Sequence, residues 1–115
     1  MARMSIRIDL DREGRLGPGK VALLERIAEC GSISAAGRAM AMSYRRAWQL
    51  VADLNTSFVE PLVTAQMGGR QGGGAKLTAF GTKLVSEYRA IEREAEAAVA
   101  PRLRALEDAA AKGEV

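Results

Sequence analysis

Histidine is absent from the 115-residue sequence, and cysteine occurs once, as Cys30. Without histidine the chain cannot carry a Ser-His-Asp or Cys-His nucleophile, and it lacks the His and Cys clusters that hold zinc. A single cysteine cannot form a disulfide within the chain, which is typical of a reducing compartment. Because Cys30 ends an apolar helical run, we expect a small buried hydrophobe rather than a reactive thiol. We expect no cofactor and no enzymatic activity.

Aromatic side chains and long apolar runs are also scarce. Aromatic residues make up 4% of the chain, so we expect a core of aliphatic side chains and alanine. No stretch reaches the roughly 18 apolar residues of a membrane-spanning helix, and the first residues lack the apolar segment of a signal peptide. We therefore expect a cytoplasmic protein that does not contact a membrane. The length suits one folded domain with at most an appended arm.

Positive charge is distributed unevenly along the chain, which carries a net charge of +3. Residues 1–89 contain thirteen basic and eight acidic side chains, whereas residues 90–115 contain four basic and six acidic ones. A basic body with a mildly acidic arm is typical of a polyanion-binding protein that assembles through a separate element. An ordinary cytosolic domain of basic composition is the alternative interpretation.

The first part of the chain predicts a strand and a helix. Apolar and polar side chains alternate over residues 5–10, which indicates a half-buried strand. After a turn, Pro18 favours the first turn of a helix, where its missing N–H removes no hydrogen bond. Apolar residues then recur at helical spacing, and Gly31 is the expected end of this helix.

Two short helices joined by a tight turn are predicted next. Ser32 is placed to cap the first helix and Ser43 to cap the second. The apolar stripe of the second helix consists of Ala47, Leu50, Val51 and Leu54. At 100° per residue, Arg45 and Gln49 point to the opposite face, with Arg46 and Asp53 beside them. Outward Arg and Gln near the start of the second helix are typical of a helix-turn-helix.

A β-hairpin is predicted after this helix. A strand-forming run covers residues 62–67, and residues 75–77 provide the return strand. The sequence GGRQGGG between them predicts a flexible basic tip. A nucleotide-binding P-loop does not fit, because Gly74 is followed by Ala75 rather than lysine and no helix begins there. The hairpin is the expected wing of a winged helix-turn-helix.

A long helix is predicted from its cap, Thr78, to about Ala100, with Pro101 breaking or kinking the chain. At about 1.5 Å per residue it spans roughly 30 Å, too long for so small a body to cover. We therefore expect a homodimer joined through a coiled-coil-like seam. The seam consists of Leu84, Tyr88, Ile91, Ala95 and Ala98. The predicted fold is mainly α with a small β-hairpin: a winged helix-turn-helix domain over residues 1–78 and a dimerisation helix with a C-terminal arm over residues 79–115.

The helix-turn-helix segment carries a family resemblance. The strings GSISAAG at residues 31–37 and MSYRRAW at residues 42–48 resemble the helix-turn-helix of ModE-type molybdate-responsive transcriptional regulators. The glycine-rich hairpin and the amphipathic helix after it are similar to that family's wing and dimerisation helix, in the same order. The resemblance extends to about residue 100, and a less specific likeness to LysR-type regulators is confined to the helix-turn-helix. It implies a DNA-binding regulator of molybdenum-related genes.

The sequence departs from that family's pattern at its end. Family members continue into molybdate-binding domains, whereas the present sequence stops where these would begin. We therefore carry over the DNA-binding and dimerising functions and no molybdate-binding domain, and a small-molecule effector is not evident.

The expected DNA contacts fall into three groups. Arg45, Arg46 and Gln49 are candidates for base-edge contacts in the major groove, where Arg suits guanine and Gln suits adenine. For these three the alternative is a solvated polar face, with Arg46 paired to Asp53 or to water. Phosphate contacts are expected from capping or helix-start hydroxyls and one arginine, namely Ser32, Ser34, Ser43 and Arg38. In the wing, phosphate or minor-groove contacts are expected from Arg70, Gln71 and Lys76.

The aromatic pair Tyr44 and Trp48 allows two interpretations. The two residues stand four apart beside the core stripe, so packing is favoured over base stacking. The hydroxyl of Tyr44 is a further candidate for a phosphate contact.

Two other classes of function compete with a DNA-binding regulator. A winged helix can also serve as a protein-interaction or assembly module without specific DNA readout. A small-molecule enzyme would have to use carboxylates as acid and base groups. We expect these carboxylates to lie on solvated faces of helices or strands rather than to converge as a pair. The carboxylates concerned are Asp9, Glu25, Glu29 and Asp53. If DNA binding is correct, two copies related by a twofold axis read an imperfect palindrome.

Overall fold

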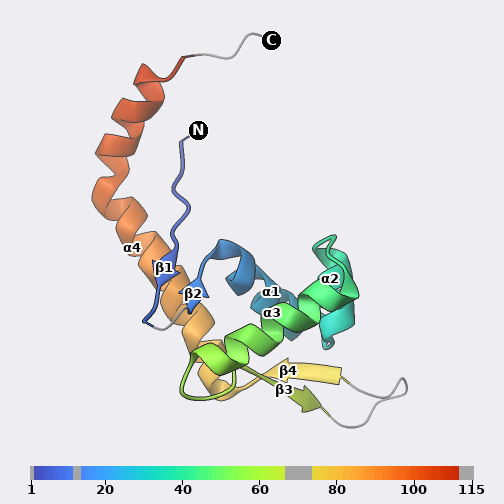
Figure 1. The fold of residues 1–115 in the computed structure, drawn as a ribbon. Helices are drawn as coiled ribbons and strands as arrows, with labels where there is room; N and C mark the ends of the chain where they lie inside the picture. The colour runs from blue at the N-terminus through green and yellow to red at the C-terminus, as the bar shows by residue number, and fades with distance from the viewer. Residues whose placement is uncertain (1, 12–13, 67–73, 112–115) are drawn as a thin grey trace.

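The computed structural model describes residues 2–11, 14–66 and 74–111. Short antiparallel strands flank three packed helices, and a long fourth helix follows them (Figure 1). In chain order the elements are β1 (Ile8–Asp9), β2 (Arg15–Leu16), α1 (Pro18–Cys30), α2 (Ile33–Ala39), α3 (Tyr44–Ser57), β3 (Val63–Gln66), β4 (Gly74–Leu77) and α4 (Ala79–Ala109). The predicted winged helix-turn-helix with a long C-terminal helix is confirmed.

Local signals set the starts of the first three helices and the end of α1, as predicted. Pro18 opens α1, and Gly31 ends it in the left-handed region with φ 74°. The hydroxyl of Ser32 accepts a hydrogen bond from the backbone N–H of Ala35 at 2.9 Å. Ser43 accepts in the same way from Arg46 at 3.0 Å. These caps satisfy N–H groups that have no partner inside their own helices.

The turn between α2 and α3 brings the two helices unusually close. A Cβ atom on Gly37 would lie 2.9 Å from the Cβ of Ala47, so only glycine fits there without a shift. Ala41 in the turn adopts a positive φ of 56°. The absence of a side chain at Gly37 therefore sets the distance of α2 from α3.

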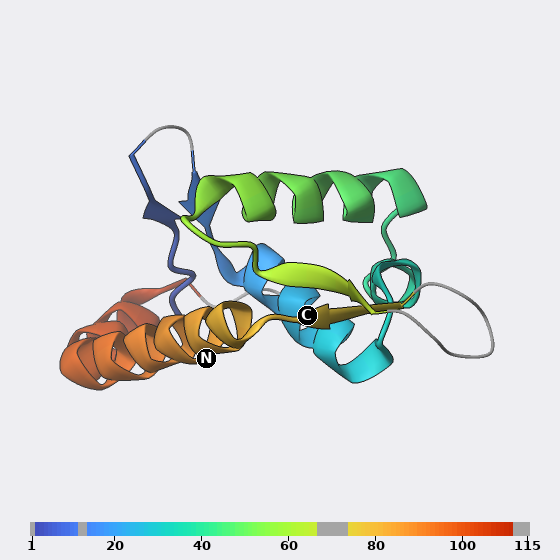
Figure 2. The same cartoon turned by 90° about the horizontal axis from the view of Figure 1, so that it is seen from below.

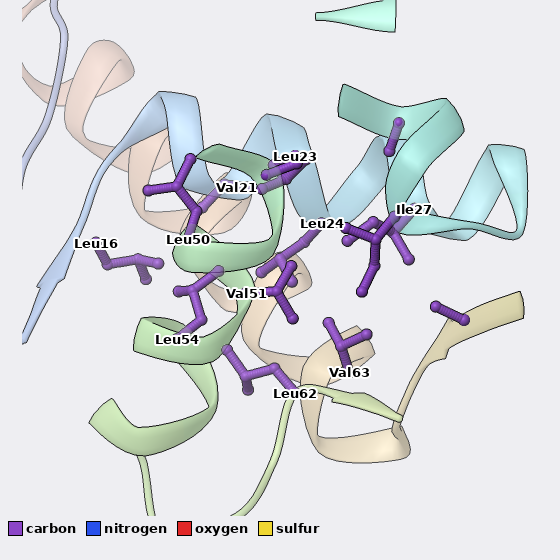
Figure 3. Close-up of a cluster of buried hydrophobic side chains, with 14 of the residues drawn as sticks. Leu16, Val21, Leu23, Leu24, Ile27, Leu50, Val51, Leu54, Leu62 and Val63 are labelled. Carbon is purple, nitrogen blue, oxygen red and sulfur yellow. The ribbon is translucent and has the colours of Figure 1, made fainter. Parts of the chain in front are cut away.

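A single aliphatic core lies between α1, α3 and the hairpin (Figure 3). The four stripe residues of α3 are all buried, as predicted, and they meet α1 and the start of β3. Cys30 corrects a prediction: it is exposed. The buried face of α1 consists of Val21, Leu23, Leu24 and Ile27. Its final turn, which contains Cys30, lies outside the core.

The N-terminal segment forms a smaller sheet than the sequence indicated. Side chains over residues 5–10 alternate between half-buried and exposed, as predicted. Only Ile8 and Asp9 pair as a strand, however, and their partner β2 was not predicted. The backbone N–H of Leu10 donates to the carbonyl of Gly14 at 2.7 Å and closes the turn.

A backbone hydrogen bond attaches the hairpin to the end of α1. β3 and β4 pair antiparallel from Val63↔Leu77 to Gln66↔Gly74, which confirms the hairpin. The N–H of Ala75 donates to the carbonyl of Gly31 at 2.9 Å, which joins β4 to the end of α1. The predicted flexible tip lies outside the described residues.

The long helix α4 extends past its predicted end. Thr78 caps it by accepting from the N–H of Gly81 at 2.9 Å, as expected, but the helix runs to Ala109 rather than Ala100. Pro101 removes one hydrogen bond to the preceding turn, and Figure 1 shows α4 changing direction between its orange and red parts. The residues after Pro101 are mostly strong helix formers, so the helix resumes.

Contacts with α1 and the N-terminal segment hold the first half of α4 against the body. Tyr88 is 1% exposed, and its hydroxyl donates to the carbonyl of Ile6 at 2.6 Å. Burial raises the pKa of Tyr88, and the neighbouring Glu92 raises it further, so the phenol stays protonated and able to donate. Arg89 donates to Glu25 at 2.6 Å and 3.2 Å and to Glu92 at 2.7 Å. These hydrogen bonds raise the pKa of Arg89.

Tyr88 therefore corrects the predicted dimer seam. The sequence placed it against a second copy, whereas the structure places it in the core of its own chain. Leu84 is also partly buried against that core. The seam is internal over the first turns of α4, and only its later residues face outward.

Candidate nucleic-acid interface

The outer side of α3 is the most open helical surface of the folded body. In Figure 2, α3 lies along the upper edge of the molecule, with no other described element above it. Arg45, Gln49, Ala52 and Thr56 are exposed on this side, opposite the buried stripe. The structure thus places the predicted readout residues on a surface that a DNA groove can reach.

The polar side chains of this surface are uncommitted. Within the described residues, Arg45, Arg46 and Gln49 form no side-chain hydrogen bond or ion pair. In particular, Arg46 does not pair with Asp53, which was the alternative interpretation from the sequence. Their donors and acceptors are available to an external ligand such as the edges of DNA bases.

The predicted phosphate-contacting residues lie around the start and end of α2 and on the hairpin. Ser32 and Ser34 are half-buried at the start of α2, and Ser43 is exposed at the start of α3. Capping uses the acceptor capacity of Ser32 and Ser43 and leaves each hydroxyl hydrogen free to donate. Arg38 and Lys76 are exposed, on α2 and β4 respectively. Arg70 and Gln71 lie outside the described residues.

A basic groove flanks α3 on one side, and the sequence analysis did not predict it. Arg46 and Asp53 form one wall, and Arg7, Arg15 and Lys20 line the groove from the N-terminal segment and the start of α1. Asp9 offsets part of this charge, with ion-pair distances of 3.0 Å to Arg7 and 3.9 Å to Arg15. The excess of basic residues in the first part of the chain was the only available signal, and it did not show which residues gather.

The aromatic pair lies on the opposite flank of α3 and corrects a second prediction. Tyr44 is 63% exposed and Trp48 46% exposed, so neither is a core residue. Their ring centroids are 5.9 Å apart at an interplanar angle of 57°. They line a shallow cleft together with Ser32, Ile33, Ser34, Ala65, Gly74 and Ala75. The buried apolar stripe of α3 is narrow, so Tyr44 and Trp48 beside it lie outside the core.

Asn55 fixes the hairpin relative to α3 and was also missed. Its side-chain oxygen accepts from the N–H groups of Leu62 and Val63 at 2.8 Å and 3.1 Å, and its amide donates to the carbonyl of Val63 at 3.0 Å. A polar residue in the last turns of α3 was the only sequence signal. Asn55 is a positioning residue, because it sets where β3 begins beside the readout helix.

Beyond the residues that hold α4 against the body, the helix carries exposed apolar side chains. Ile91 is 42% exposed and Leu106 67% exposed. Ala95 is half-buried and Ala98 exposed on the same helix. In Figure 2 this part of α4 and the hairpin lie at opposite ends of the molecule, so a contact through α4 leaves α3 and the hairpin accessible.

The described residues contain neither a metal-binding cluster nor a membrane-spanning helix. No group of three or more His, Cys, Asp or Glu side chains is placed to hold a metal ion in this part of the chain. None of its helices combines the length and the apolar character needed to cross a membrane.

Curated relatives match most of the chain. The chain is 50% identical over 84 residues to the molybdenum-pterin-binding protein MopB of Rhodobacter capsulatus, covering 72% of this chain and 31% of MopB. It is 41% identical over 99 residues to the molybdenum transport protein ModE of Azotobacter vinelandii, covering 86% and 36%. It is 33% identical over 87 residues to the DNA-binding transcriptional dual regulator ModE of Escherichia coli K12, covering 76% and 33%. The chain thus spans about a third of the length of these relatives.

Solved structures share the fold. The DNA complex of the CbnR DNA-binding domain superposes with a TM-score of 0.56 at 22% identity, covering 77% of this chain and 95% of that one. Full-length LysG of Corynebacterium glutamicum with bound effector Arg gives a TM-score of 0.53 at 23% identity, covering 76% and 29%. At these identities the likeness concerns the winged-helix architecture alone.

A family model matches more than half of the chain. The model describes the bacterial regulatory helix-turn-helix proteins of the lysR family, and it matches residues 19–82, from the start of α1 to the first turn of α4. The matched region contains the capped helix pair and the hairpin described above. The chain therefore belongs to the lysR family of bacterial regulatory helix-turn-helix proteins.

Proposed function

We propose that the protein binds duplex DNA through α3 and regulates the transcription of molybdenum-related genes. The observation that carries this proposal is the exposed, uncommitted set of Arg45, Arg46 and Gln49 on the second helix of a helix-turn-helix. The names of the ModE relatives support the regulatory role and the link to molybdenum. These names assign no ligand to the present chain.

The flanks of α3 suit the two phosphate strands that border a major groove. A groove about 12 Å wide admits one helix, so a sugar-phosphate strand runs along each side of it. On one side lie the hydroxyls of Ser32 and Ser34, which line the cleft beside Tyr44 and Trp48. On the other side lies the basic groove with Arg46 and Lys20. Both flanks thus supply donors, which fix the position of the protein while α3 reads the bases.

Arg70 and Gln71 remain sequence-based proposals for the wing. They fall in the chain segment that connects β3 to β4, and this segment lies outside the described residues. A basic segment at that place can reach a neighbouring minor groove.

The part of α4 from Ile91 to Leu106 is the proposed homodimer contact. The accessible seam consists of Ile91, Ala95, Ala98 and Leu106, whose spacing keeps them near one face of the helix. A twofold pairing of these helices presents two copies of α3 to one duplex, so the operator is an imperfect palindrome with half-sites about one helical turn or a multiple of it apart.

Selection of bound duplexes from a random DNA pool, followed by a salt titration, tests DNA binding. We expect an enriched palindrome and an affinity that falls steeply as salt rises. About four phosphate contacts per protomer give a slope of roughly −7 for log K against log salt in a dimer. A scrambled duplex serves as the control for specificity. Failure to enrich any sequence, together with a flat salt response, would favour the assembly-module alternative.

Replacement of Ile91 with glutamate tests the dimer contact. A carboxylate buried against a partner helix has no compensating charge, so we expect the dimer dissociation constant to rise at least about tenfold. Sedimentation velocity across a concentration series measures this change. The control is Ala97→Glu, which introduces the same charge at an exposed position away from the seam. Equal effects of the two substitutions would contradict the seam.

A further inference from the structure

Two large aromatic side chains lie exposed next to the readout face without a function so far. Trp48 is the sole tryptophan of the chain, and Tyr44 is more exposed than Trp48. Both stand on the first turns of α3, where the other outward side chains are polar. Exposed apolar surface of this kind often marks a binding site, because its contact with water is unfavourable.

The cleft around these rings has an apolar floor and a polar rim. We call it the aromatic notch and define it by Tyr44, Trp48, Ser32, Ile33, Ser34, Ala65, Gly74 and Ala75. Among the described residues no charged side chain lines it, in contrast to the basic groove on the other flank of α3. Its walls come from the start of α2, from α3 and from the paired residues Ala65 and Ala75 of the hairpin. Asn55 and the Ala75–Gly31 hydrogen bond hold the hairpin wall in place. The notch is therefore a formed site rather than a chance gap.

The position of the notch on α3 determines what can enter it. Tyr44 and Trp48 precede Arg45 and Gln49 by one residue each, so they lie about 100° around the helix from the base-reading side chains. If α3 occupies a major groove, the notch faces the edge of that groove. The C5-methyl group of thymine is the apolar group that DNA presents there.

The ring geometry argues against stacking of a whole base between the two aromatics. A base sandwiched between two aromatic side chains stacks on a ring face at each side, so it needs nearly parallel rings with room for a base between them. The centroids here are only 5.9 Å apart, and the rings are tilted by 57°. A methyl group, which needs no parallel faces, fits the notch better than a flipped base.

We propose that Tyr44 and Trp48 hold the C5-methyl group of a thymine at the edge of each half-site, so that the aromatic notch makes the protein select thymine there. This inference rests on the proposed function, since it requires α3 to lie in a major groove. It adds Trp48 to the specificity-determining residues and gives Tyr44 an apolar contact in place of core packing.

Replacement of each thymine of the selected duplex with deoxyuridine tests the proposal, because this change removes only the methyl group. We expect one position in each half-site at which the wild-type affinity falls about fourfold, the effect of one buried methyl group. In Trp48→Ala and in Tyr44→Ala the thymine and uracil duplexes should bind nearly equally. The emission of Trp48, the only tryptophan, should also shift less with the uracil duplex than with the thymine duplex.

Val59→Ala is the matched control, because it shortens an exposed apolar side chain outside the notch and should keep the full thymine preference. Circular dichroism of each variant shows whether the fold is retained. Equal affinity for every uracil duplex, a selected operator without an invariant thymine, or an unchanged thymine preference in both notch variants overturns the inference. A wild-type protein that still binds DNA in these cases leaves the proposed function standing, whereas failure to bind any duplex overturns both.

Discussion

Replacement of Arg45 with alanine is expected to lower the affinity for the selected operator by about 10-fold to 100-fold. Arg45 is exposed on the outer side of α3 and forms no bond within the described residues, so the substitution leaves the fold intact. A bidentate arginine–guanine pair contributes about 1–3 kcal/mol of discrimination, which corresponds to this range. Fluorescence anisotropy with the selected duplex and with a scrambled duplex measures specific and non-specific binding side by side.

Two controls separate base reading from charge. Arg102→Ala removes an exposed positive charge from the second half of α4, remote from α3, and should change operator affinity little. Arg45→Lys keeps the charge but loses the planar guanidinium. Compared with Arg45→Ala, we expect it to recover the affinity for the scrambled duplex more fully than the affinity for the operator. If Arg45→Ala lowers the affinity for the operator and the affinity for the scrambled duplex equally, Arg45 contacts only phosphates.

Replacement of Gly81 with alanine is expected to destabilise the protein by about 3 kcal/mol or more. A Cβ atom at this position would lie 2.2 Å from the carbonyl oxygen of Leu62 and 3.0 Å from its carbonyl carbon. The clashing atoms belong to the backbone, and Asn55 and Thr78 hold this backbone in place through hydrogen bonds. Relief of the clash therefore requires α4 to move away from the hairpin, which disturbs packing throughout the core.

Thermal and denaturant unfolding measure this effect. A loss of about 3 kcal/mol lowers Tm by roughly 12 °C or more in a domain of this size. Gly19→Ala is the matched control, because nothing lies within 4 Å of a Cβ at that position in the first turn of α1. Alanine favours the helix over glycine by up to about 1 kcal/mol, so this variant should be equal to or more stable than the wild type. Similar stabilities of the two variants would contradict the close contact between α4 and Leu62.

The sequence predicted which residues form an apolar stripe on each helix, but it did not reveal which part of the structure contacts that stripe. The spacing of Leu84, Tyr88 and Ile91 predicted one continuous seam, but the body of the same chain buries Tyr88 and leaves Ile91 outside. An apolar stripe indicates that some surface covers it, without indicating which one. The same reasoning failed for Tyr44 and Trp48, whose exposure follows from the place at which α2 and the hairpin meet α3.

The amino-acid sequence by itself determined the local structure of the protein. The caps Ser32, Ser43 and Thr78 and the stop at Gly31 act within a few residues, so the order of the helices and most of their ends could be predicted. The outward face of Arg45 and Gln49 followed from helical periodicity in the same way.

Only the tertiary structure decided which distant residues share a surface. Arg7, Lys20 and Arg46 line one groove although they lie far apart in the chain, and the aromatic notch combines α2, α3 and both strands of the hairpin. Pro101 lies within a continuous helix because the favourable residues on both sides outweigh one missing hydrogen bond. Such outcomes depend on the sum of long-range packing free energies, which no local pattern contains.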